Sequence, residues 1–94
     1  QHPFPLTISV VFNFFQKLFM FHGIKNPADA PRVLGVSPYF VKDYQAAAQK
    51  YSMRQTAKVL QLLNEYDLKS KGVGASNLPL EELMKEMVLK IVSV

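Results

Sequence analysis

The chain has 94 residues, which fits a single domain (residues 1–94) and is near the size at which a hydrophobic core suffices without covalent staples. Hydrophobic residues make up 49% and cysteine is absent, which excludes disulfides and thiolate metal sites and favours a cytoplasmic origin. The net charge of +4, from 11 basic and 7 acidic residues, is compatible with a nucleic-acid partner but does not require one, because basic residues form no consecutive run.

The first predicted element is an apolar helix over Leu6 to His22, after an irregular segment at residues 1–5, where Pro3 and Pro5 restrict the preceding residues to extended backbone. Polar residues interrupt the apolar stretch well before the roughly 20 residues that a membrane span needs. A basic leader region and a cleavage site, which would mark a secretory signal, are also missing. We therefore expect a core helix and no membrane partner. One broad face should be buried: Val11, Phe12, Phe14, Phe15, Leu18, Phe19 and Phe21.

A short second helix is expected over Ala28 to Leu34. Gly23 ends the first helix, and the Asn26-Pro27 pair is a typical start signal for the next one. Pro31 is tolerable there only in the first turn, where its missing N–H would have no helical partner, and Gly35 closes the segment.

A third helix should begin at Ser37 and run to about Lys50. The Ser37 side chain can accept a hydrogen bond from an unpaired backbone N–H, and Pro38 suits the first helical position.

The fourth predicted helix, Met53 to Lys71, carries signals at both ends. Ser52 and Gln55 form a Ser-x-x-Gln capping box, in which each side chain satisfies a backbone N–H of the other residue. Gly72 suits the left-handed conformation that follows a helix. The apolar side chains cover more than half of the circumference, which predicts a helix that is central to a bundle. They are Met53, Ala57, Val59, Leu60, Leu62, Leu63, Tyr66 and Leu68.

Asp67 falls in the middle of this apolar arc. Because an unpaired buried carboxylate costs several kcal/mol, we expect Asp67 to have a partner. Lys71, four residues on, is the first candidate, and a neighbouring helix N-terminus is the second. We interpret Asp67 as a buried structural anchor, whose replacement by alanine would cost on the order of 1–3 kcal/mol.

The last helix should begin near Leu78 or Pro79, after a flexible link of small residues at 73–77. Leu89 lies on its polar side, where an exposed leucine can mark a surface that faces another chain. The apolar residues at helical spacing are Leu80, Leu83, Met84, Met87, Val88 and Ile91.

Together these elements predict an all-α fold, a compact bundle of about five helices. A catalytic, cofactor-binding or metal-binding constellation is not evident, because His2 and His22 are unaccompanied and the glycines form no phosphate-binding loop. We therefore expect neither an enzyme nor a small-molecule substrate. A rival interpretation is a small helix-turn-helix DNA-binding regulator, because Pro31 to Val41 has the outline of that motif. A third is a peripheral membrane module that uses Leu6 to Phe21, although Lys17 is the only charge in that segment.

Three motifs in order also resemble one family. Leu34-Gly35-Val36, then Tyr51-Ser52, then Asp67 with Lys71-Gly72 are similar to the C-terminal region of the delta subunit of bacterial DNA polymerase III, a clamp-loader component. The resemblance covers nearly the whole chain from about Leu6 onward. Pro31 departs from it, because a small residue is common at that position.

The resemblance implies a helical collar domain at the C-terminal end of a longer subunit, whose ATPase-like N-terminal domains lie outside these residues. Collar domains hold the other clamp-loader subunits together, and the whole subunit acts with the sliding clamp and DNA as part of the DNA polymerase holoenzyme. No nucleotide cofactor is implied, because the delta subunit lacks ATPase activity. On this interpretation Leu89 and Met20 are expected to contact neighbouring collar domains.

Overall fold

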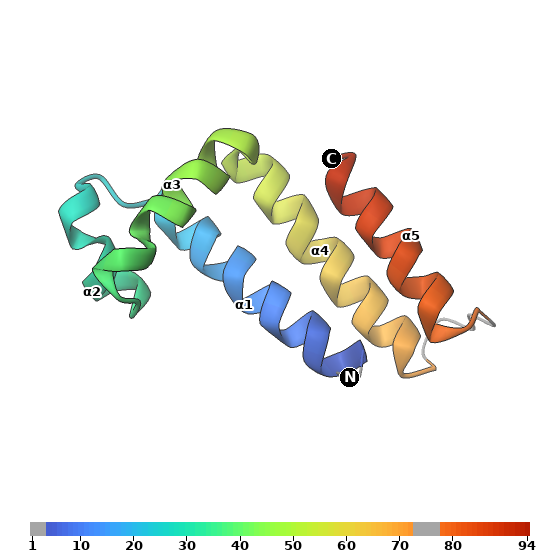
Figure 1. Ribbon diagram of the computed structural model, residues 1–94. Coiled ribbons are helices and arrows are strands. Elements are labelled where there is room, and N and C mark those ends of the chain that lie inside the picture. Colours follow the sequence, from blue (N-terminus) through green and yellow to red (C-terminus); the bar gives the residue numbers. More distant parts are fainter. Residues whose placement is uncertain (1–3, 73–77) are drawn as a thin grey trace.

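The computed structural model describes residues 4–72 and 78–94, and within these ranges the fold is entirely helical (Figure 1). The prediction of an all-α bundle of about five helices is confirmed. The elements in order are α1 (Phe4–His22), the 3-10 turn η1 (Pro27–Asp29), α2 (Ala30–Leu34), the 3-10 turn η2 (Pro38–Phe40), α3 (Val41–Lys50), α4 (Met53–Ser70) and α5 (Leu80–Val92).

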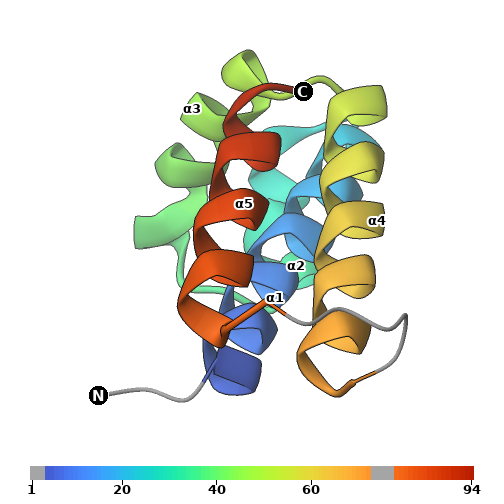
Figure 2. The same cartoon turned by 90° about the vertical axis from the view of Figure 1, so that its right-hand side faces the viewer.

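Three long helices, α1, α4 and α5, make up most of the molecule. Figure 1 shows α4 between the other two, with the start of α1 beside the end of α4, so that these two helices are antiparallel. Figure 2, from the side, shows α5 in front of the α1–α4 layer. The position of α4 agrees with the expectation that its wide apolar arc makes it central.

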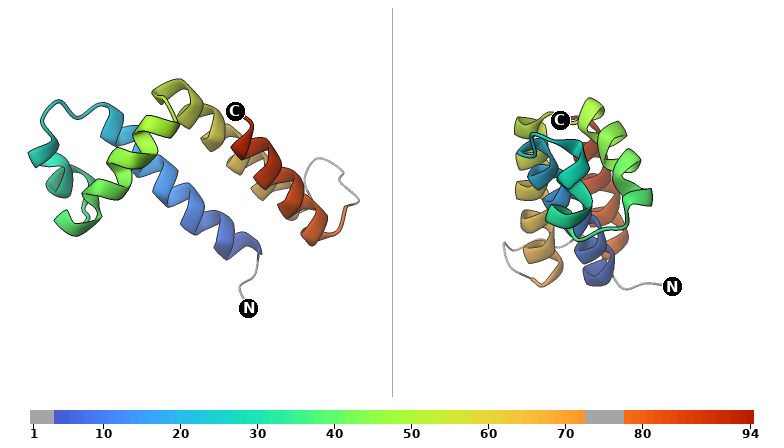
Figure 3. Two further views of the ribbon diagram at one scale, coloured as in Figure 1. Left: turned by 45° about the horizontal axis from the view of Figure 1, so that its top comes forward. Right: turned by 90° about the vertical axis from the view of Figure 1, so that its left-hand side faces the viewer.

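The shorter helices α2 and α3 pack against the C-terminal part of α1 (Figure 3). Aromatic contacts hold α3 in place, because the ring of Tyr44 stacks on Phe14 with centroids 4.8 Å apart and also contacts Phe21. Stacked aromatic rings of this kind contribute about 0.5–1.5 kcal/mol beyond the area that they bury.

The buried hydrophobic side chains of the described residues form one cluster, contributed by every α-helix. Leu63 and Tyr66 of α4 and Leu18 of α1 are among those with no exposed surface. The full set is Ile8, Phe15, Leu18, Ala30, Leu34, Tyr44, Val59, Leu63, Tyr66, Leu83, Met87 and Ile91.

The predicted capping serines and terminal glycines are confirmed. Ser52 and Gln55 form both hydrogen bonds of a capping box, at 3.1 and 2.9 Å. Ser37 accepts a hydrogen bond from the N–H of Tyr39 at 3.3 Å, although the first turn that it caps is 3-10. Gly72 follows α4 with a positive φ of 87°, and Gly35 follows α2 with a φ of 69°.

Two expectations about α1 were wrong. The helix begins at Phe4, because Pro5 falls in the first turn, where a missing N–H costs nothing. Phe19, expected on the buried face, is exposed. The rest of the irregular lead-in, residues 1–3, and the link at residues 73–77 lie outside the described residues.

Candidate functional site

The predicted pair of Asp67 and Lys71 exists, but not in the core. The Lys71 Nζ donates to the Asp67 Oδ2 at 3.0 Å. The Asp67 side chain is 26% exposed and the Lys71 side chain 57%. Asp67 is therefore only partly buried, and the expectation of a buried anchor was wrong to that extent. Asp67 is partly exposed because it lines an open groove between α1 and α4.

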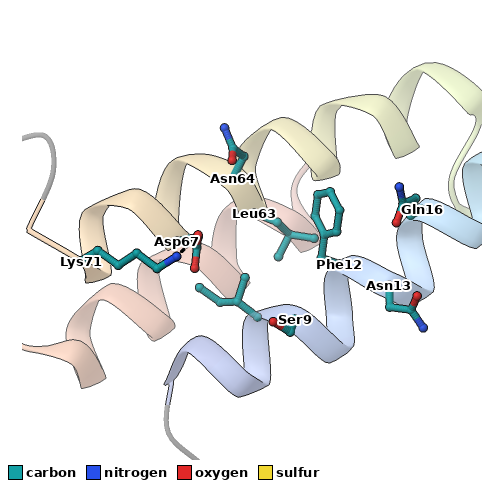
Figure 4. Close-up of a pocket in the computed structure, with 9 residues that line it drawn as sticks. Ser9, Phe12, Asn13, Gln16, Leu63, Asn64, Asp67 and Lys71 are labelled. Atoms are coloured by element: carbon teal, nitrogen blue, oxygen red, sulfur yellow. Dashed lines mark hydrogen bonds and ion pairs between the residues drawn. The ribbon is translucent and has the colours of Figure 1, made fainter.

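Asp67 and Lys71 stand at one end of an open groove between α1 and α4 (Figure 4), with a volume of about 420 Å³. Its polar groups are one hydroxyl and three side-chain amides, together with this ion pair. It therefore offers hydrogen bonds to a polar ligand, but no His or second carboxylate for general acid–base chemistry. The lining residues are Ile8, Ser9, Phe12, Asn13, Gln16, Leu63, Asn64, Asp67 and Lys71.

A polar cluster that the sequence did not predict joins α4 to α5. The buried Tyr66 hydroxyl donates a hydrogen bond to the Glu86 carboxylate, and Lys69 and Lys90 lie over the Tyr66 ring, 4.6 and 5.3 Å from its centroid. Burial, and then the hydrogen bond to Glu86, raise the pKa of Tyr66. The phenol therefore stays protonated at neutral pH and serves packing.

His22 has a structural partner, because its Nε2 lies 2.8 Å from the carbonyl oxygen of Tyr51 and so ties the end of α1 to the α3–α4 turn. Among the described residues, groups of three or more metal-binding side chains do not occur.

An open and largely apolar surface lies on α5. Leu83, Met87 and Ile91 of this helix are buried, yet its apolar stripe extends well beyond them onto the outside. Leu89, the predicted interface residue, is 65% exposed. A shallow hollow of about 610 Å³ lies along this surface, lined by Glu81, Met84, Lys85, Val88 and Leu89. We call these five residues together with the exposed Leu80 and Val92 the α5 outer face.

Met20, the second predicted interface residue, is 43% exposed and lies near the C-terminal end of α1. It is not part of the α5 outer face. Any contact that it makes with another chain would therefore use a separate part of the surface.

Comparisons with protein-family models, with curated proteins and with solved structures gave no match. None of the described helices is both long and apolar enough to cross a membrane.

Proposed function

We propose that this chain is a non-catalytic assembly module that joins other protein chains through the α5 outer face. The observation that carries the proposal is the excess of apolar surface on α5. Three buried residues, Leu83, Met87 and Ile91, fix the helix to its own bundle. Met84, Val88 and Leu89 extend the apolar surface into solvent. Interfaces of permanent assemblies have this character, because they resemble a core divided between two chains.

Charged residues of both signs border this surface. Glu81 and Lys85 line the same hollow as Val88 and Leu89, and Glu81 makes no ion pair with a described residue. A partner helix with apolar residues at helical spacing and a flanking basic residue would complement this arrangement, because rim charges set orientation and partner choice.

The more specific form of the proposal is a collar domain of the delta subunit of a bacterial clamp loader, located in the cytoplasm. The order of the Leu34-Gly35-Val36, Tyr51-Ser52 and Asp67–Lys71 motifs supports this form, as does the all-helical fold. The partner helices would then belong to the collar domains of neighbouring subunits, with the sliding clamp and DNA reached through the rest of the subunit.

The test is association with the remaining clamp-loader subunits, measured by co-elution in gel filtration and by titration. We expect the double variant Val88→Glu/Leu89→Glu to weaken association about 30-fold or more, the loss typical of central interface residues. Because Val88 is 47% and Leu89 65% exposed, the variant should fold, which circular dichroism would check.

Val33→Glu is the matched control. Val33 is also an exposed valine, but it lies on α2 at the opposite end of the molecule from α5. The clamp-loader form of the proposal would be contradicted if Val88→Glu/Leu89→Glu and Val33→Glu bound the other subunits equally well. It would also be contradicted if the original chain did not bind them.

The helix-turn-helix interpretation remains the second candidate, because α2, the Gly35 turn and α3 follow one another as in that motif. It predicts sequence-specific binding to duplex DNA by the chain alone. Selection from a random duplex library that enriches no sequence would exclude this function.

A further inference from the structure

The charges of this chain are divided unevenly along it. Residues 1–58 contain seven basic and two acidic residues, whereas residues 59–94 contain four basic and five acidic ones. The first part therefore carries a formal charge of +5 and the second −1, so the whole excess of positive charge lies before the middle of α4.

Ion pairs increase this difference in charge between the two parts of the chain. All four lysines after residue 58 pair with an acid on their own helix: Lys69 with Glu65, Lys71 with Asp67, Lys85 with Glu82 and Lys90 with Glu86. Of the seven basic residues up to residue 58, only Arg32 pairs with a described acid, which is Asp29. The remaining six cations make no ion pair with a described acid.

Three of the six follow one another around the junction of α3 and α4. Lys50 ends α3, Arg54 lies in the first turn of α4, and Lys58 follows one turn later on the same side of the helix. All three are exposed. We call Lys50, Arg54 and Lys58 the basic corner. In Figure 1 the junction of α3 and α4 lies at the top of the molecule.

We propose that the basic corner binds the phosphate backbone of nucleic acid. Exposed glutamines accompany the cations, Gln45 and Gln49 on α3 and Gln61 on α4. Such amides donate to phosphate and sugar oxygens and supplement the ionic contacts.

A single strand is the favoured form, because η2, immediately before α3, carries an exposed aromatic pair. Tyr39 and Phe40 contact each other edge to face, with centroids 5.3 Å apart, and the Lys42 Nζ lies 4.9 Å from the centroid of the Tyr39 ring. Exposed rings next to cations are the usual platform on which unpaired bases stack.

A membrane surface fits the basic corner less well. Peripheral binding to lipid needs large apolar side chains that insert between the headgroups. Around the basic corner, Met53 is the only exposed large apolar side chain on the first turns of α4, and glutamines occupy the neighbouring positions on α3.

The experiment is a salt titration of binding to a fluorescent oligothymidylate, followed by anisotropy. Arg54→Gln/Lys58→Gln removes two contacts, so the slope of log K against log salt should become shallower by about 1.4, since each single-strand contact contributes about 0.7. The control Lys71→Gln/Lys85→Gln removes the same charge from exposed positions and should leave the slope unchanged. Tyr39→Ala should weaken binding to the single strand more than binding to a duplex.

Several results would overturn the inference. Equal effects of the two double variants would show that only net charge matters. Failure to bind at low salt, or binding to vesicles of phosphatidylcholine and phosphatidylserine in place of the oligonucleotide, would exclude the nucleic-acid partner. The inference is independent of the proposed assembly function, because Val88→Glu/Leu89→Glu should leave oligonucleotide binding intact.

Discussion

The hydroxyl of Tyr66 on α4 donates a hydrogen bond to the carboxylate of Glu86 on α5, and this contact joins the two helices through residues 20 positions apart in the sequence. Tyr66 has no exposed surface, so its polar end must be satisfied inside the protein. The contact thus positions α5, the helix that carries the proposed interface.

This contact predicts alkaline destabilisation. The ordinary pKa of a tyrosine is 10.0, and the pKa of Tyr66 is raised in the folded protein. Above pH 10 the unfolded chain therefore releases this proton while the folded chain keeps it, so the free energy of unfolding falls as pH rises. Urea denaturation from about pH 8 to about pH 11.5 should show a shallower fall for Tyr66→Phe. Burial also raises the pKa of Tyr44, so this residue accounts for part of the fall in stability that remains in Tyr66→Phe. An unchanged pH profile would argue against a buried Tyr66 hydroxyl.

The capping box predicts a loss of stability when its serine is removed. Ser52→Ala should lower the free energy of unfolding by about 1 kcal/mol, because the N–H of Gln55 loses its acceptor. Ser52→Gly should cost only a few tenths of a kcal/mol, because glycine is a tolerated N-cap residue. Chemical denaturation of the two variants side by side gives the comparison, and a larger loss for glycine would contradict the capping role.

The exposure of Asp67 lowers the expected cost of replacing it. A partly exposed pair four residues apart on one helix contributes about 0.3–0.5 kcal/mol. Asp67→Asn should therefore destabilise the protein by about that amount, less than the 1–3 kcal/mol expected for a buried anchor. The loss of stability caused by Asp67→Asn should be smaller in about 1 M salt, where exposed charges are screened. A loss above about 1 kcal/mol at both salt concentrations would restore the buried interpretation.

Two leucines on different helices should respond very differently to truncation. Leu63 is fully buried in the cluster between α1, α4 and α5, whereas Leu89 is mostly exposed. Leu63→Ala should cost about 2–5 kcal/mol through lost burial and the cavity that remains. Leu89→Ala should stay within about 0.5 kcal/mol, because it removes no internal contact of consequence. Similar midpoints of thermal unfolding for the two variants would refute the assigned core.

Two glycines offer a similar comparison for the backbone. Gly35 has a φ of 69° and open space where a Cβ would stand, so Gly35→Ala is strained by its backbone alone, at a cost of about 1–2 kcal/mol. Gly23 has no positive φ, and a Cβ there would meet the Met20 carbonyl oxygen at an ordinary 3.5 Å. Gly23→Ala should thus change the stability little or increase it slightly. Equal losses, measured by urea denaturation, would contradict the left-handed turn after α2.

Local signals made the helix boundaries predictable. Capping residues and terminal glycines act through their nearest neighbours in the chain, so their effect can be predicted without knowing the fold. The residues concerned are Ser37, Ser52, Gly35 and Gly72. The Asp67–Lys71 pair was predictable for the same reason, since residues four apart always share a helix face.

The surfaces were less predictable. Helical spacing predicted that both Phe19 and Asp67 are buried. This prediction failed because an apolar pattern indicates which side of a helix can be buried but not how much of that side a neighbour covers. The Tyr66–Glu86 contact and the basic corner are likewise products of how α3, α4 and α5 meet.

By itself, the sequence determined that the chain is helical and, through its capping residues and glycines, where most of the helices begin and end. Only the tertiary structure decided which apolar residues remain outside, on α5, and how the end of α3, with Lys50, is placed next to the start of α4, with Arg54 and Lys58. The physical reason is that helix formation, capping and the ion pairs of this chain depend on residues within a few positions of one another, whereas burial depends on whichever distant segment packs alongside.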